Sequence, residues 1–253
     1  LSWVETYLFS FLGYATHGLL DACTSYGTQL LWPFSDERIS WNYISVVDPF
    51  LSIPVILVII FAIIIKNKLI TFFGIFYIFI YLTFGAFQEN RAEKAGQAIS
   101  NLRGHVSKNL TVKPSLGNLF LWKTIYEFDD FYYVDAVRLF HTSEFCKGTI
   151  IKKLDLSNEF LALNKKSQQF KDIKRFEWFS QGYLGKKFDS NIITDVRYSA
   201  VPNEVDGLWG IEINQKKDDT EHVDWVVNRS NYTKKWDRFL NLLLGKNCQK
   251  FVN

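Results

Sequence analysis

A histidine and an aspartate lie four residues apart near the start of the chain, at His17 and Asp21. On a helix this spacing puts both side chains on one face. Neutral imidazole and carboxylate both bind divalent metal ions, so the pair could supply two ligands of a metal site. The surrounding sequence is mostly apolar, and charged groups beside lipid are functional candidates because they are costly to place there. A polar contact between helices is an equally good explanation of these residue types.

Two more charged residues follow in the same polar stretch, at Arg38 and Asp48. The planar guanidinium of Arg38 suits a phosphate or a carboxylate. An arginine at the membrane interface, or one paired with Asp48, is at least as good an explanation. Because Pro49 suits the first turn of a helix, Asp48 is predicted to cap that helix. Asp48 is also a candidate third metal ligand or general base.

The run from His17 to Arg38, followed by Val47-Asp48-Pro49, resembles the bacterial YdjM family of inner-membrane proteins. Those proteins are classed as metal-dependent hydrolases. The likeness is close over residues 16–54 and looser over 113–140 and 178–210. The resemblance implies a divalent metal ion, zinc or manganese. The metal ligands would be His17, Asp21 and Asp48, and the catalytic groups would be Asp48 and Arg38. An anionic substrate would be bound by Thr24, Tyr26, Thr28 and Arg38.

Members of that family usually carry further transmembrane sequence and a second His-rich motif upstream. The present chain opens inside an apolar run and has no Met at position 1. We therefore expect it to be a fragment that lacks its true N-terminus, and we expect the remaining metal ligands to come from the missing part.

Apolar residues make up 48% of the 253-residue chain and are concentrated in its first third. Residues 1–15 are typical of the end of a membrane helix. Two apolar runs, 49–65 and 69–87, are long enough to cross a bilayer, and the short Lys66-Asn67-Lys68 loop makes them antiparallel neighbours. The polar stretch 24–48 is too broken to span lipid and is predicted to be a re-entrant or interfacial loop.

The pattern changes after residue 108, where aromatic and β-branched runs favour strands. A hairpin is predicted over 119–140, with Asp129-Asp130 at its turn, and further strands are predicted near 148–154, 192–199, 208–214 and 222–227. Helices are predicted over 157–187, with Ser157 as the cap and an apolar stripe through Phe170, Ile173, Phe176 and Phe179, and over 232–245. Asp195 and Arg197 alternate with apolar residues on a strand, so an exposed ion pair is sufficient to explain them. The sequence thus predicts a multi-pass α-helical membrane domain followed by a soluble α+β domain built on an antiparallel sheet. The domain boundaries are 1–88 for the membrane domain, 89–108 for a connecting helix and 109–253 for the soluble domain.

The remaining features bound the partners and the compartment. A net charge of +3 is too small to indicate nucleic acid. The three cysteines are odd in number and far apart, with no CxxC pair, so Cys23 is predicted to be a packing residue. His141, with Glu144 and Cys146 near it in the sequence, is a weaker candidate for a metal site because convergent ligands are lacking. The lipid bilayer is the expected partner, in a bacterial inner membrane. Lys66 and Lys68 lie in the loop on one side of the membrane, and more positive charges lie on the opposite side, which carries the C-terminal domain: Arg38, Arg91, Lys94 and Arg103. By the positive-inside rule this excess favours a cytoplasmic position for the C-terminal domain.

Two functions fit these observations. The first is a membrane-bound metal-dependent hydrolase that acts on a lipid or a phosphoester through a metal-activated water. The second is a non-catalytic membrane module whose C-terminal domain binds a protein partner. Whether the protein is an enzyme stays open on the sequence alone.

Overall fold

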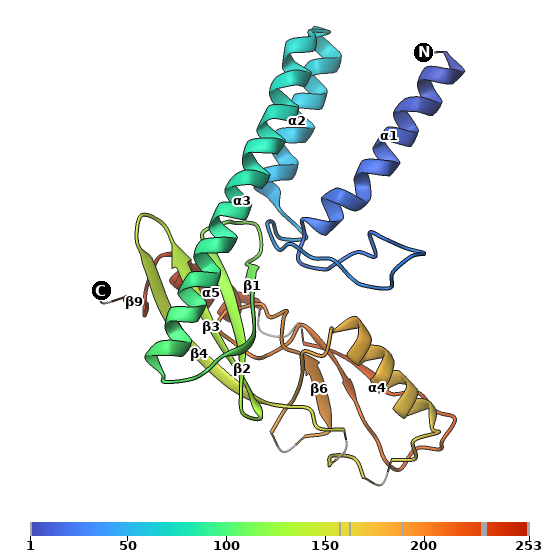
Figure 1. The fold of residues 1–253 in the computed structure, drawn as a ribbon, viewed down its shortest axis with the longest axis vertical. Helices are drawn as coiled ribbons and strands as arrows, with labels where there is room; N and C mark the ends of the chain where they lie inside the picture. The colour runs from blue at the N-terminus through green and yellow to red at the C-terminus, as the bar shows by residue number, and fades with distance from the viewer. Residues whose placement is uncertain (1, 157, 162, 189, 229–231, 252–253) are drawn as a thin grey trace. The chain divides into compact units, whose positions relative to one another are not determined.

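The computed structural model describes residues 2–156, 158–161, 163–188, 190–228 and 232–251 (Figure 1). It divides into two compact units. The N-terminal unit comprises Leu1–Ala92 with Val112–Trp122, and the C-terminal unit comprises Glu93–Thr111 with Lys123–Asn253. The predicted boundaries at residues 88 and 108 stay a prediction.

Three helices form most of the N-terminal unit: α1 (Trp3–Ala22), α2 (Pro49–Ile65) and α3 (Lys68–Leu102). Their ends follow from local chemistry. Ser2 and Glu5 cap each other's backbone N–H groups at the start of α1. Asp48 caps α2 with Pro49 in its first turn, as the sequence predicts. A left-handed Lys66 ends α2, so the chain reverses at once into α3.

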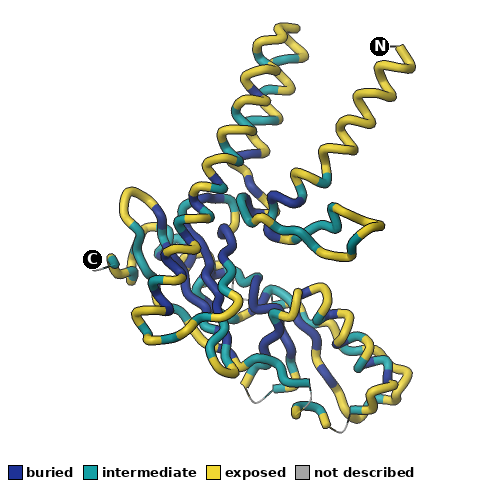
Figure 2. The backbone as a smooth tube through the Cα atoms, viewed as in Figure 1, coloured by how far each residue is buried: buried dark blue, intermediate teal, exposed yellow. Residues whose placement is uncertain are grey.

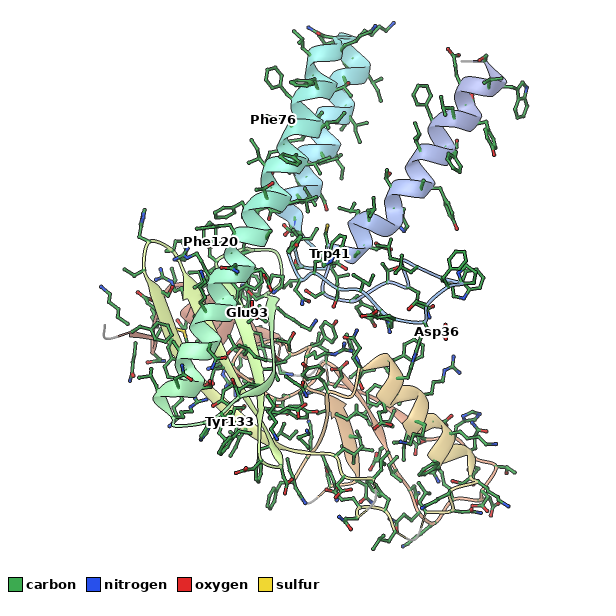
Figure 3. The ribbon with its side chains drawn as sticks, viewed as in Figure 1. Asp36, Trp41, Phe76, Glu93, Phe120 and Tyr133 are labelled. Carbon is green, nitrogen blue, oxygen red and sulfur yellow. A yellow bond between two sulfur atoms is a disulfide. The ribbon has the colours of Figure 1, made fainter. Side chains whose placement is uncertain are left out.

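One helix of the described residues, α3, is long and apolar enough to cross a membrane. The apolar helix α2 is shorter, with 17 residues. The structure therefore supports one candidate span and does not support the multi-pass arrangement. Many residues along all three helices are nevertheless exposed (Figure 2), and most of the large ones among them are apolar. Phe76, for example, projects from α3 in Figure 3.

The helices α2 and α3 lie side by side as an antiparallel pair (Figure 1). A Cβ atom placed on Gly74 of α3 would come within 2.5 Å of a Val58 methyl group of α2, so the two backbones approach more closely than a larger residue would allow. The predicted packing of these two runs as neighbours is thus present in the structure.

The C-terminal sheet is antiparallel at every pairing that the register defines, with strand order β1-β2-β3-β4-β5-β6-β7-β8 and β9 on β4. This confirms the predicted antiparallel sheet. The strands are β1 (Lys108–Pro114), β2 (Leu121–Phe128), β3 (Phe131–Leu139), β4 (Ser143–Lys153), β5 (Leu184–Lys186), β6 (Ile192–Asp195), β7 (Trp209–Glu212), β8 (Asp224–Val227) and β9 (Gln249–Lys250). Asp129, with a positive φ of 49°, turns the predicted β2–β3 hairpin.

Two helices accompany the sheet, α4 (Gln168–Phe179) and α5 (Tyr232–Leu243). The helix predicted over 157–187 is wrong in extent, because Ser167 rather than Ser157 caps α4 and the chain has left the helix by Ser180. Ser157 itself lies outside the described residues. The predicted apolar stripe is correct at Ile173 and Phe176, which join a core cluster with Ile193 and Ile211.

A buried ion pair fixes the polar end of α3 to the sheet within the C-terminal unit. Both nitrogens of the Arg103 fork donate to Asp135, at 2.6 and 2.8 Å. Asp135 is 1% exposed, lies where the β3–β4 register shifts, and also accepts the Gly148 N–H at 2.8 Å. Each carboxylate oxygen therefore has a donor, which is the condition for burying a charge in a fold.

Removing Arg103 would leave the buried carboxylate of Asp135 without its opposite charge. Arg103→Met should therefore lower the free energy of unfolding by about 3–5 kcal/mol. The exposed pair Lys174–Glu177 is the matched control, because Glu177→Ala should cost about 0–1 kcal/mol. Thermal unfolding of the full chain in detergent would measure both, and equal losses in the two variants would contradict this assignment.

Candidate functional site

His17 and Asp21 face each other in the last turns of α1, as their spacing predicts. The His17 Nε2 lies 3.3 Å from an Asp21 carboxylate oxygen. The two side chains are 69% and 47% exposed, so the imidazole and the carboxylate are both accessible to a ligand from outside the helix. An open imidazole beside a carboxylate is a donor set that suits zinc or manganese.

Asp48 is engaged as a helix cap. One of its oxygens accepts the N–H groups of Phe50 and Leu51, at 3.1 and 3.3 Å. The Tyr81 hydroxyl of α3 lies 2.9 Å from both oxygens. Asp48 is 4% exposed, so its carboxylate ties α2 to α3 and is satisfied without a metal ion. The capping role that the sequence predicts for Asp48 is therefore confirmed, and its role as ligand or base stays a prediction.

Arg38 closes a turn in the polar loop. Its Nη2 donates to the carbonyl oxygens of Tyr26 and Gly27, at 3.1 and 3.0 Å, and its guanidinium lies 5.9 Å from the centre of the Tyr26 ring. Gly27 has a φ of +82°, a conformation that a side chain rarely permits. The arginine thus stabilises a glycine turn in this structure, and its binding of an anionic group stays a prediction.

The predicted substrate-binding residues occupy the start of the loop. The Thr24 hydroxyl donates to the Asp21 carbonyl at 2.7 Å and so caps the end of α1. Thr28 exchanges two backbone hydrogen bonds with Ile39, at 3.0 and 2.9 Å, which draws the loop into a narrow ribbon. Tyr26 is 48% exposed. No helix or long strand is described between residues 24 and 48, in agreement with a broken polar loop.

A buried lysine holds this loop, and the sequence analysis missed it. The Lys113 Nζ donates to the Ser25 carbonyl and to the Asn42 side-chain oxygen, each at 2.9 Å, and Lys113 is 4% exposed. Residue 113 belongs to the N-terminal unit although it is far along the chain. No local pattern marks it, because the signal is its burial and burial depends on the tertiary fold.

Backbone packing holds the same loop from the side of α3. A Cβ atom on Gly85 would lie 2.4 Å from the Tyr43 carbonyl oxygen, so the helix and the loop meet backbone to backbone. Gln88 is also fully buried, and its amide donates to the Leu119 carbonyl at 2.8 Å. The position of Gln88 at the end of the second apolar run predicts a solvated helix start, or a side chain that reaches the polar loop. The structure instead uses Gln88 as an internal contact of the unit.

The described residues contain no group of three or more His, Cys, Asp or Glu side chains that could hold a metal ion. His17 and Asp21 have suitable chemistry, but two ligands do not complete a site that normally has four. A metal ion bound by them would need further ligands, from water, from a side chain such as Asp48 after rearrangement, or from groups outside the described residues.

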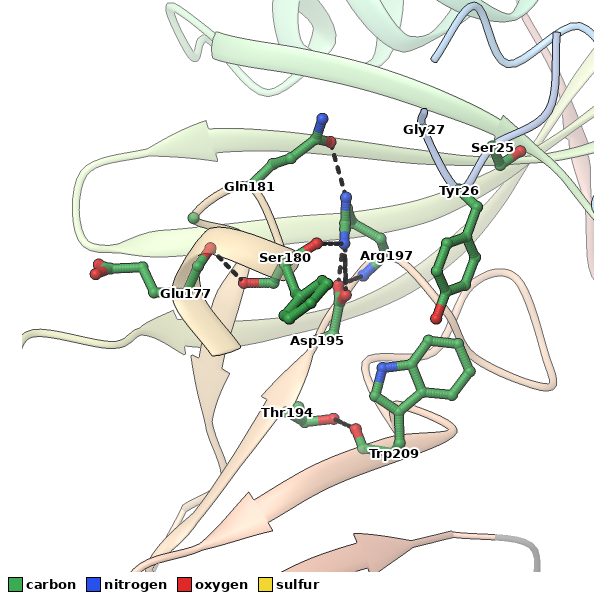
Figure 4. A network of polar contacts seen from close by, with 12 residues as sticks. Ser25, Tyr26, Gly27, Glu177, Ser180, Gln181, Thr194, Asp195, Arg197 and Trp209 are labelled. Atoms are coloured by element: carbon green, nitrogen blue, oxygen red, sulfur yellow. Dashed lines mark hydrogen bonds and ion pairs between the residues drawn. The ribbon is translucent and has the colours of Figure 1, made fainter. Parts of the chain in front are cut away.

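Two predictions about the C-terminal unit are corrected by the structure. Cys146 and Cys248 form a disulfide, so Cys146 is unavailable as a ligand beside His141. Asp195 and Arg197 were interpreted as an exposed pair on a strand, but their side chains are 3% exposed and their closest atoms are 2.7 Å apart. Strand β6 ends at Asp195, and Arg197 turns inward to bind Gln181 as well (Figure 4).

A helix that is long and apolar enough to span a bilayer, with exposed apolar helices beside it, is typical of a membrane protein. Residues 2–92 match the family model of the YdjM inner membrane protein, which confirms the resemblance over this segment. Neither a curated protein nor a solved structure matches the chain.

The loop contacts of Lys113 give a test of its role. Lys113→Met should leave the Ser25 carbonyl and the Asn42 side chain without their buried donor, a loss of about 1–3 kcal/mol. Amide hydrogen exchange over residues 24–44 should then become faster. Lys108→Met, in the same strand but exposed, is the matched control and should leave this exchange unchanged. Unchanged exchange in Lys113→Met would show that the lysine does not hold the loop.

Proposed function

We propose that this protein is a membrane-bound metal-dependent hydrolase, with His17 and Asp21 as two ligands of its metal ion. The observation that supports this most directly is the open pair of side chains, 3.3 Å apart, at the end of α1. A bound zinc or manganese ion would supply an activated water and would polarise the bond to be cleaved. The YdjM match supports the membrane setting of this site.

The other proposed residues would act around that pair. Arg38, with Thr24, Tyr26 and Thr28 on the same loop, would hold the anionic group of a lipid or phosphoester. Asp48 would serve as a third ligand or as a general base only after it exchanges its hydrogen bonds with Tyr81 for a new partner. The choice of a lipid or phosphoester follows from the position of the loop at the ends of apolar helices.

The second candidate function is a non-catalytic membrane module whose C-terminal unit binds a protein partner. The observation that favours it is the engagement of three charged groups in structural contacts. Asp48 caps α2, Arg38 closes the Tyr26–Gly27 turn, and Lys113 ties the loop down. In this reading the polar loop needs no ligand, because the fold itself satisfies its charges.

Bound metal decides between the two candidates. The intact chain, purified in detergent and loaded with zinc or manganese, should retain the ion in stoichiometric amount. His17→Ala and Asp21→Ala should each lower metal affinity by 10-fold or more, because each removes one ligand. Inductively coupled plasma mass spectrometry and competition with a metal-binding dye would measure the loss.

The exposed His141 supplies the matched control, since His141→Ala removes an imidazole outside the proposed site and should leave metal binding intact. If the folded wild-type protein binds no zinc or manganese, the hydrolase proposal fails and the structural module stands. Metal binding that survives in both His17→Ala and Asp21→Ala would place the ion elsewhere.

We also propose that α2 and α3 cross the membrane as a hairpin. A helix of 17 residues is at the lower limit for a span, and α2 packs closely on α3 through Gly74 and Val58. The lysines of the loop, Lys66 and Lys68, would then lie on the cytoplasmic side.

The disulfide favours a non-cytoplasmic position for the C-terminal unit. Disulfides persist in oxidising compartments such as the bacterial periplasm and are rare in the cytosol. Arg103, one of the positive charges that favoured the cytoplasmic side, is neutralised by Asp135 within the fold. The Cys146–Cys248 bond and the lysine loop therefore agree on one orientation.

Labelling of spheroplasts with a membrane-impermeant maleimide tests this orientation. Lys216→Cys, on the exposed surface of the C-terminal unit, should be labelled in intact spheroplasts. Asn67→Cys, in the lysine loop, is the matched variant and should be labelled only after the membrane is permeabilised. The reverse pattern would place the C-terminal unit in the cytoplasm.

A further inference from the structure

Lys123 of β2 and Ser199, which follows β6, meet inside the C-terminal unit. The Lys123 Nζ lies 2.8 Å from the Ser199 Oγ. Lys123 is 4% exposed, whereas Ser199 is half-buried and so lies nearer to solvent. We propose that Ser199 is a nucleophile and Lys123 its general base, in an acyl-transfer site that acts on carboxylic esters or amides. Neither the family match nor the proposed metal site assigns an activity to these residues.

The contacts of Lys123 favour an uncharged amine. Its two hydrogen-bond acceptors in the described part of the chain are the Ser199 hydroxyl and the Glu204 carbonyl, which lies at 2.8 Å, and both are neutral. The nearest carboxylates are each held by an arginine. Asp195 pairs with Arg197, and the Glu204 side chain pairs with Arg238 of α5.

Burial lowers the pKa of Lys123 to about 7, although the charges of Asp195 and Glu204 oppose that shift. A large share of the amine is then neutral at physiological pH, whereas an exposed lysine is almost fully protonated there. A neutral amine with a free lone pair can accept the hydroxyl proton of a serine, which is the arrangement of a serine–lysine dyad.

Ser199 is in position to give up its proton after two rotations, because the Lys123 amine, which now donates to the Ser199 Oγ, must first turn its lone pair toward the serine. Its hydroxyl donates to the Val201 carbonyl at 2.7 Å in this structure. Turning the hydrogen about the Cβ–Oγ bond would direct it to the Lys123 nitrogen, without moving either heavy atom. Backbone pairing of Ser199 with Gly207 fixes the serine's main chain while this occurs.

The proposed reaction transfers the acyl group of the substrate first to Ser199 and then to water. The Ser199 Oγ bonds to the carbonyl carbon of the ester or amide while its proton passes to the Lys123 Nζ. The bond to the alcohol or amine leaving group then breaks, and the lysine ammonium returns the proton to that group. Water then attacks the carbonyl carbon of the acyl-serine while Lys123 takes one of its protons. The bond between that carbon and the Ser199 Oγ breaks, the lysine ammonium returns the proton to the Oγ, and the carboxylic acid leaves.

A purely structural role gives a different chemistry. If Lys123 is instead a charged group that holds the segment from Ser199 to Glu204 in place, Ser199 has no neutral base beside it and is an ordinary hydroxyl. It should then react no faster than other serines of the chain. The reactivity of Ser199 and its dependence on pH therefore separate the two roles.

The test uses the full chain in detergent and a fluorophosphonate probe. An activated serine attacks the phosphorus of this probe, fluoride leaves, and the serine stays covalently labelled. Mass spectrometry of peptides should place the label on Ser199. Ser199→Ala should abolish it, and Lys123→Met should lower the labelling rate by 100-fold or more. Ser190→Ala is the matched control, since Ser190 is also half-buried and lies outside this cluster, and its label should be unchanged.

The pH profile of wild-type labelling keeps the test decisive if Lys123→Met fails to fold. The rate should rise through a midpoint near pH 7, because the base is active in its deprotonated form. No label on Ser199 in the folded chain would overturn the proposal, and so would a rate that is flat between pH 6 and 9. Labelling should withstand a metal chelator, so this result is independent of the proposed metal site.

Discussion

Burial of positive charge is the constraint on which both units depend. A cation removed from water is costly unless carbonyl or carboxylate oxygens replace the solvent. Two cations of this protein, Lys113 and the partly buried Arg103, meet that requirement differently. Lys113 meets it with a carbonyl and an amide oxygen, and in doing so fastens a loop whose own backbone pairing includes isolated bridges but no helix or long strand. Arg103 meets it with a carboxylate at an irregular point of β3.

The same requirement for hydrogen-bond partners divides the charged groups into two kinds. Some are fully hydrogen-bonded within the fold and stabilise it, and others remain accessible to a ligand. Asp48 and Arg38 are satisfied by donors and acceptors of the backbone and by Tyr81. His17 and Asp21 contact each other while both remain accessible. Lys123 is the intermediate case. It is buried and donates hydrogen bonds to two neutral groups, which an uncharged amine can also do.

Local chemistry predicted much of the fold. Caps such as Asp48-Pro49 and the Asp129-Asp130 turn were readable because they depend on residues next to one another. The extent of α4 was not, since the polar run before Ser167 has helix-compatible residues that the fold uses otherwise. The disulfide and the contacts of Lys113 with the polar loop also escaped prediction, because each joins segments far apart in the sequence. The burial of Asp195 and Arg197 escaped it because burial depends on how distant segments pack around the pair, and the residues themselves are only two positions apart.

The Cys146–Cys248 bond joins residues 102 positions apart, so it encloses α4, α5 and the strands from β5 to β8 in one covalent ring. Closing a ring of that size restricts the unfolded chain by about 4–5 kcal/mol on the chain-entropy account. A single cut of the backbone between these cysteines would open the ring without releasing a piece. A protease that nicks an exposed turn there would thus leave the sheet's strands tethered, and able to pair again after the cut.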